Sequence, residues 1–326
     1  LLSLQSHHQR QQYQRKFSFL RRRRIACLNN SNPIISNNTI SENSANAGGG
    51  IACLNNSNPI ISNNTISENA ASFGGGGILC QLSSPTIRNN TISENATSFG
   101  GGGIGCATSD PTISNNTISG NSAGFGGGIR CQNSSPAIIN NTISGNSATI
   151  GSGLFLSNSS SPSVENTVIA FNSGPHIVCG DETSVPTLSC CDVFGNEGGD
   201  WVGCIAGQEG INGNFSLDPL FCDTATADYH IDQYSPCVPP FSSCGVLIGA
   251  LGVGCGDEYL CADANGDSLI NVDDVDFLMN FYFYGGATPF PYLASDLNCD
   301  GSVNIADITY LAAYINGTGA PPCCQQ

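Results

Sequence analysis

The chain has 326 residues, of which only 10% are charged while 40 are glycine, so it is neither a charge-rich disordered chain nor an ordinary helical protein. Seven of the nine basic residues lie in the first 24 positions, and residues 25–326 carry 25 acidic residues against two arginines. Because residues 25–326 are so acidic, they should repel nucleic acid and anionic membranes, and we do not expect either as a partner. No apolar run reaches the length of a membrane span.

The basic start of the chain is unlike the rest. When the degenerate codons of residues 4–24 are read one nucleotide out of frame, they permit SNPIISDNNTSENSASFGGGG, which is close to SNPIISNNTISENAASFGGGG at residues 57–77. We therefore interpret residues 1–24 as an out-of-frame remnant of one more repeat, and not as a nucleic-acid-binding or targeting segment.

Residues 25–178 repeat themselves. The period is marked by prolines that lie 25 or 26 residues apart, at Pro33, Pro59, Pro85, Pro111, Pro136 and Pro162. A fixed period of this size, with short apolar alternation and no helical stripe, predicts a solenoid of β coils that stack on one another.

Within one coil we expect three strands of three to five residues, bent at Asn-Asn and Gly-Gly. In the third coil Ile78 and Cys80 should face inward with Leu79 outward, and Ile87 and Ile92 should also face inward. Equivalent residues then lie about 4.8 Å apart in columns. One column is of buried thiols, at Cys27, Cys53, Cys80, Cys106 and Cys131. Another is of Asn residues that bond coil to coil, at Asn37, Asn63, Asn89, Asn115 and Asn140.

These repeats resemble the parallel β-helix coils of the pectate-lyase-like and NosD-like superfamily. The resemblance implies an all-β fold class, namely a right-handed parallel β-helix solenoid. It does not specify an activity, because that fold hosts lyases, hydrolases, epimerases, adhesins and inert stalks.

The stack offers little for catalysis. Enzymes of that superfamily use clustered carboxylates with a basic residue, whereas Glu42, Glu68 and Glu94 form a column of identical side chains on turns. General acid–base catalysis needs two titratable groups that converge on one bond. Arg88 and Arg130 belong to different columns and are interpreted as lone surface residues. We therefore favour a non-catalytic β-helix, with a polysaccharide lyase or glycoside hydrolase as the alternative.

A third column carries hydroxyl groups. Thr and Ser flank the inward Ile of one strand in five successive coils, as Thr39/Ser41, Thr65/Ser67, Thr91/Ser93, Thr117/Ser119 and Thr142/Ser144. An outward array of this kind resembles ice-binding β-helices, and it also suits contact with a polysaccharide. The plainer interpretation is that Thr and Ser fit exposed strand positions.

Residues 179–256 lose the period and contain eight of the twelve cysteines that follow the repeats. An even number of cysteines in a loop-rich region, without CxxC pairs or zinc-spaced His, predicts disulfides and hence a secreted, extracellular protein. Because the last coil of a solenoid exposes its core, we expect this region to be a disulfide-braced C-terminal cap.

Residues 257–326 hold two copies of a loop motif: residues 263–274 read DANGDSLINVDD and residues 296–307 read DLNCDGSVNIAD. Both place oxygen ligands at loop positions 1, 3, 5, 9 and 12 and a main-chain carbonyl at position 7, which is the donor set that calcium takes from a tight loop. The first set is Asp263, Asn265, Asp267, Leu269, Asn271 and Asp274. The second set is Asp296, Asn298, Asp300, Ser302, Asn304 and Asp307.

An amphipathic helix should follow each loop. The apolar positions are Val275, Leu278 and Tyr282 after the first loop, and Ile308, Leu311 and Ile315 after the second. This duplicated arrangement resembles a type I dockerin. The resemblance implies a small α-helical domain with calcium as its cofactor and a cohesin-like protein as its partner. An intramolecular role, in which the module tethers or stabilises the chain itself, is the alternative.

Overall fold

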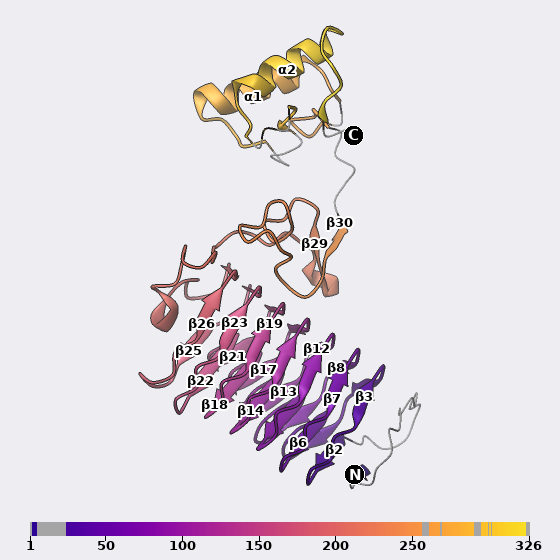
Figure 1. Ribbon diagram of the computed structural model, residues 1–326, viewed down its shortest axis with the longest axis vertical. Coiled ribbons are helices and arrows are strands. Elements are labelled where there is room, and N and C mark those ends of the chain that lie inside the picture. The colour runs from indigo at the N-terminus through magenta and orange to yellow at the C-terminus, as the bar shows by residue number, and fades with distance from the viewer. Residues whose placement is uncertain are drawn as a thin grey trace. The chain divides into compact units, whose positions relative to one another are not determined.

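The computed structural model describes residues 2–4, 24–255, 261–267, 269–289, 295–298, 300 and 302–323. The chain divides into two compact units, Leu1–Gly254 and Cys255–Gln326. In the first unit the strands stack as parallel coils, which confirms the solenoid expected from the proline period (Figure 1). The segment interpreted as an out-of-frame remnant lies mostly outside the described residues.

Four parallel sheets form the walls of the coil stack. Sheet A contains β1 (Leu2–Leu4), β2 (Ile25–Leu28), β6 (Ile51–Leu54), β10 (Ile78–Gln81), β14 (Ile104–Ala107), β18 (Ile129–Gln132), β22 (Leu154–Ser157) and β25 (Ile177–Cys179). Sheet B contains β3 (Ile34–Ser36), β7 (Ile60–Ser62), β11 (Thr86–Arg88), β15 (Thr112–Ser114), β19 (Ala137–Ile139), β23 (Ser163–Glu165) and β26 (Thr187–Ser189). Sheet C contains β4 (Thr39–Ser41), β8 (Thr65–Ser67), β12 (Thr91–Ser93), β16 (Thr117–Ser119), β20 (Thr142–Ser144), β24 (Val168–Ala170) and β27 (Asp192–Phe194).

Sheet D was not expected, since three strands per coil were predicted. It contains β5 (Ser44–Ala45), β9 (Ala70–Ala71), β13 (Ala96–Gly100), β17 (Ser122–Phe125) and β21 (Ser147–Ile150). These short strands consist largely of Ser, Ala and Gly, so they lack the apolar alternation by which a strand is recognised in a sequence.

The inward side chains form one continuous core. In the third coil Ile78, Cys80, Ile87 and Ile92 are fully buried, as the alternation predicted. The five expected thiols are paired in register along sheet A, and all of them are buried. Burying an Ile side chain contributes roughly 1.5–3 kcal/mol, so this repeated core is the main source of stability.

The outer face of sheet A is more covered than expected. Leu79 was predicted to face solvent, but only 9% of its surface is exposed. The reason is the glycine turn before it: Gly75 has a φ of +59°, and a Cβ there would lie 2.7 Å from the Cα of Leu79. Glycine permits both this conformation and this close approach, so the turn folds over the outward side chain.

The bonding Asn column was assigned to the wrong member of each Asn-Asn pair. Asn89 is exposed at the bend with a φ of 56°, a conformation that Asn tolerates better than most residues. Asn90 is the residue that points inward: its Nδ2 donates to the main-chain oxygen of Ile61 at 3.0 Å, and its Oδ1 accepts from Nδ2 of Asn64 at 3.0 Å. The bonded column is therefore Asn38, Asn64, Asn90, Asn116 and Asn141.

A second bonded column, missed in the sequence, separates sheets C and D. It runs through Asn43, Asn69, Asn95, Asn121, Asn146, Asn172 and Asn196. Each of its members follows a bend residue of positive φ, such as Glu94 before Asn95. The two columns satisfy buried amide groups at both ends of β4, β8, β12, β16 and β20 and so fix the stacking register of these coils.

The parallel coils continue past residue 178 to β27, and the chain then turns over the end of the stack. Trp201 and Ile205, which lies in the short 3-10 helix η1 (Gly203–Ile205), join the core of the coils. The Cys179–Cys204 disulfide fastens this segment at the end of the stack.

Residues 215–250, here called the strap, pack instead on the outer face of sheet C. Ile231, Val238 and Ile248 form one apolar cluster with Val168 and Ala170 of β24. A Cys190–Cys244 disulfide ties the strap to the coils. The strap contains the 3-10 helix η2 (Thr224–Thr226) and the strands β28 (Phe221–Asp223) and β29 (Asp228–Asp232). These two strands form sheet E with β30 (Val253–Cys255).

Disulfides also engage Cys222, Cys255, Cys261 and Cys323. Cys191 and Cys237 are buried free thiols, so the disulfide prediction fails for these two of the later cysteines. Cys299 and Cys324 lie outside the described residues.

The second unit contains α1 (Val272–Tyr284) and α2 (Ile305–Ile315), each of which begins within the last three residues of one of the two loops. Leu278, Ile308 and Leu311 lie in its apolar core, with Val275 and Ile315 packed against it, as predicted. Tyr282 was also predicted to face this core, but 47% of its surface is exposed.

Candidate functional site

The two loops of the second unit have the same local structure. In each, the Asn at position 9 is the residue that caps the following helix, and the Asp at position 12 lies in its first turn. Asn271 accepts a hydrogen bond from the N–H of Asp273, and Asp274 accepts from the N–H of Asn271, which makes a capping box. Asn304 and Asp307 repeat this pattern.

The carboxylates also close each loop on itself. Asp274 Oδ1 accepts from the N–H of Ala264 at 2.9 Å, and Asp263 Oδ1 accepts from the N–H of Asp267 at 3.1 Å. Asp307 Oδ1 accepts from the N–H of Leu297 at 2.8 Å, and Asp296 Oδ1 from that of Asp300 at 3.1 Å in the second loop. The expected ligands at positions 1, 9 and 12 therefore shape the loop and its helix.

Burial separates the expected ligands into two groups. The carboxylates at positions 1 and 12 are buried: Asp263, Asp274, Asp296 and Asp307. Asp267, Leu269, Asp300 and Ser302 are exposed, and the four Asn ligands are half-buried. Among the described residues, no three His, Cys, Asp or Glu side chains are arranged as a metal-binding group. In each loop the position-5 carboxylate instead accepts from the position-3 amide, as Asp267 does from Asn265 at 3.2 Å.

The hydroxyl array of sheet C is divided into two parts by the strap. Thr117 and Ser119 in β16, and Thr142 and Ser144 in β20, are buried. In the first three coils Thr39, Thr65 and Thr91 are exposed, and Ser41, Ser67 and Ser93 are half-buried. The continuous five-coil array expected from the sequence is therefore wrong in extent: it is open to solvent on β4, β8 and β12.

The Glu column lies at the bends that follow these strands. Glu42, Glu68 and Glu94 are exposed, each with a φ of 54° to 56°, so they are turn residues on one edge of sheet C. In the next coils Gly120 and Gly145 take the same place. The carboxylates are stacked along the coil axis and do not converge on a common point.

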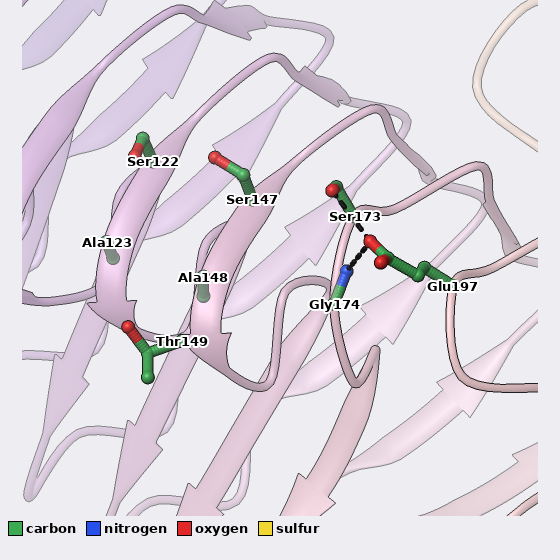
Figure 2. A pocket seen from close by; sticks show the side chains of 8 residues that line it. All are labelled: Ser122, Ala123, Ser147, Ala148, Thr149, Ser173, Gly174 and Glu197. Atoms are coloured by element: carbon green, nitrogen blue, oxygen red, sulfur yellow. Dashed lines mark hydrogen bonds between the residues drawn. The ribbon is translucent and has the colours of Figure 1, made fainter.

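A shallow depression of about 430 Å³ opens on the outer face of sheet D. Ser122, Ser147 and Ser173 lie in a row on successive coils along it (Figure 2). Glu197 Oε2 accepts from Ser173 Oγ and from the N–H of Gly174, both at 2.9 Å. Among the described residues that line the depression, Glu197 alone is titratable. One carboxylate does not provide the pair that glycoside hydrolysis requires, so the lining suits hydrogen bonding to a ligand better than acid–base chemistry.

The family of the chain follows from its coils. A family model described as right-handed beta helix region matches residues 9–124 and 93–215. The chain belongs to the right-handed β-helix family. No curated protein and no solved structure matches it. None of the helices in the described part of this β-helix protein has the length and apolar character needed to cross a lipid bilayer.

Arg130 is not the lone surface residue expected. The glycine turn at Gly126 folds over it, and its guanidinium carbon lies 4.8 Å from the centroid of the Phe99 ring. Partial burial lowers the pKa of Arg130, although a guanidinium remains charged at any physiological pH. Phe99, Phe125 and Phe155 continue this contact as a row of rings with centroids 5.2–5.8 Å apart.

Asp192 is a buried carboxyl group of the β-helix that the sequence did not single out. Its Oδ1 accepts from the N–H of Leu217 at 3.1 Å, and Cys237 Sγ lies 3.5 Å from its Oδ2. Burial raises the pKa of Asp192 to about 8, and the charges of Asp200 and Asp218 act in the same direction. A neutral carboxyl group therefore anchors the strap to the last coil at neutral pH.

Proposed function

We propose that this protein is a secreted, structural or ligand-binding β-helix that is anchored through a calcium-dependent docking module, its second unit. The observation that carries the proposal is the pair of loop–helix elements with matching hydrogen bonds and matching buried carboxylates. One such loop is a common turn, but two copies with the same donor set at the same offsets are expected of a dockerin-like module.

The charge of the second unit supports a cation. Residues 255–326 contain no Lys, Arg or His, although four carboxylates of the loops are buried. Burying a carboxylate costs free energy, and a bound divalent cation would offset that cost. The oxygen donors of the two loops are Asp, Asn and main-chain carbonyl groups, which suit calcium. Calcium would supply charge neutralisation and would replace the contact between Asn265 and Asp267.

The surface of α1 supports docking. Met279, Tyr282, Phe283 and Tyr284 are exposed to 39–79% near the end of this helix. Exposed apolar side chains gathered on one helix mark a protein interaction site. A cohesin-like protein is the partner that this arrangement favours. The disulfides of the first unit are compatible with an extracellular location.

Calorimetric titration of the full chain with calcium tests the first step. Wild type should bind two ions, and Asp263→Asn or Asp296→Asn should each remove one, because each removes the charge of a buried loop carboxylate. Asp276→Asn is the matched control, since Asp276 is exposed on α1 and lies outside both loops. Absence of binding heat, or equal loss in the control, would refute the calcium sites.

Capture on a panel of immobilised type I cohesin modules tests the second step. We expect retention by at least one module in calcium and release by a chelator. Exchange of exposed apolar residues, as in Tyr282→Ser with Phe283→Ser, should abolish retention while leaving calcium stoichiometry unchanged. Calcium binding without retention by any module would leave an intramolecular role and would contradict docking.

A further inference from the structure

The strap shows how the hydroxyl face of sheet C is recognised. The hydroxyl oxygen of Tyr229 lies against the bend at Gly145, near both Ser119 and Ser144, which are register partners in adjacent coils. The main-chain N–H of Ala250 donates to Thr142 Oγ1 at 3.0 Å. The strap thus sets a hydroxyl group beside two adjacent coils, and its main-chain N–H at Ala250 donates to a threonine.

The same face continues without a break into the first three coils. Ser93 is the register partner of Ser119, and Thr91 that of Thr117, so β12 extends the surface that the strap covers on β16. The open T-x-S face consists of Thr39, Ser41, Thr65, Ser67, Thr91 and Ser93. Its rows repeat at the strand spacing of about 4.8 Å.

This face is rigid before any ligand binds. Ile66 and Ile92, between the outward Thr and Ser, are fully buried in the core. Below the ends of β12, Asn90 and Asn95 are bonded to the coils on both sides. A surface whose groups are already fixed loses little conformational entropy on binding, so modest hydrogen bonds suffice for measurable affinity.

The charge along the edge of the open T-x-S face restricts which ligand can bind there. Glu42, Glu68 and Glu94 border the serine rows as exposed carboxylates. Where the strap covers the continuation of this face, it places there the hydroxyl group of Tyr229 and the main-chain N–H of Ala250, neither of which is charged. An anionic polymer would meet three stacked carboxylates and be repelled, whereas hydroxyl groups can both donate to carboxylates and exchange hydrogen bonds with Ser and Thr.

We propose that the open T-x-S face binds a neutral polysaccharide lying along the coil axis, with sugar hydroxyls hydrogen bonded to its Thr and Ser side chains as the N–H of Ala250 is to Thr142. The inference deepens the proposed function by assigning ligand contact to the first unit, while the second unit serves docking. A polymer of hydroxylated rings matches a surface that repeats the same hydroxyl pair in every coil.

The test uses the full chain and affinity electrophoresis in gels that contain a soluble neutral β-glucan or polygalacturonate, each with calcium and with chelator. Wild type should be retarded by the β-glucan in both conditions and not by polygalacturonate. Thr91→Val with Ser93→Ala should weaken retardation by about tenfold in dissociation constant, since two hydrogen-bonding hydroxyls are lost.

The matched control is Thr112→Val with Ser114→Ala. These residues flank Ile113 in the same Thr-Ile-Ser sequence, but on sheet B. The control should bind as wild type does, and thermal unfolding should show that both variants retain the coils. No retardation of wild type, retardation by polygalacturonate alone, or equal weakening in both variants would overturn the proposal. Retardation that requires calcium would assign polysaccharide binding to the second unit and would also overturn the proposal for the T-x-S face. If the chain binds no calcium but is still retarded in chelator, only the docking proposal is refuted.

Discussion

The bonded Asn columns make a quantitative prediction, because each Asn-Asn bend offers a buried and an exposed residue of the same type. The side chain of Asn90 takes part in five hydrogen bonds, two with Asn64 and one each with Ile61, Arg88 and Asn116. Asn89 beside it is exposed. Replacing each by Ala removes the same atoms from two different environments.

Asn90→Ala should lower the free energy of unfolding by about 3–5 kcal/mol, because several buried partners are left without a hydrogen bond at a cost of 1–3 kcal/mol each. Asn89→Ala should cost about 1 kcal/mol, since Ala adopts the left-handed conformation less readily than Asn. For a unit of this size the first loss corresponds to a decrease of about 10 °C in Tm and the second to a few degrees.

Differential scanning calorimetry of the full chain measures both variants against wild type, with the transition of the first unit followed separately from that of the second. Asn89→Gly is the control for backbone conformation, since Gly adopts positive φ freely and should leave Tm nearly unchanged. Equal decreases for Asn89→Ala and Asn90→Ala would show that the columns do not carry the stability assigned to them.

Three further predictions concern the strap and the thiols. Asp192→Asn should reduce the pH dependence of stability: the carboxyl group ionises near 3.8 when unfolded and near 8 when folded, so its contribution to wild-type stability falls as pH rises through this range, and the Tm of the variant should fall less than that of wild type between pH 4 and pH 8. Removing the Cys190–Cys244 disulfide with Ser at both positions should speed proteolysis within residues 215–250 without shortening the protected coils, as mass spectrometry of the fragments would show; unchanged cleavage would contradict the tethering role. The five column thiols should resist alkylation in the native state and react in denaturant, and rapid native labelling would contradict their burial.

Much of the β-helix could be predicted from the sequence because its signal is repeated. The proline period, the Thr-Ile-Ser strands and the inward Ile and Cys each occur in several coils, so chance patterns average out. The two adjacent Asn residues could not be told apart in this way. A bend residue of positive φ interrupts the alternation of strand residues, and the sequence does not show on which side of Asn90 the interruption falls.

The strap could not be placed, since its contacts with sheet C join residues far apart in the sequence, such as Ala250 and Thr142, which are 108 positions apart. One signal was nevertheless present. Val168-Ile169-Ala170 replaces Thr-Ile-Ser in the sixth coil, which exchanges outward hydroxyls for apolar side chains and indicates a covered face. In the second unit, loop spacing predicted the capping Asn and Asp residues as ligands, and the structure shows that these residues also begin α1 and α2.

Hydrogen–deuterium exchange of the full chain, with calcium and with chelator, tests most directly whether the buried loop carboxylates serve a calcium ion. Removal of calcium should increase deuterium uptake in α1 and α2, because the carboxylates that cap both helices would lose their counter-ion, while sheets A to D keep the same protection. Identical uptake in the second unit under both conditions would contradict the calcium-dependent module and, with it, the proposed anchoring of the β-helix.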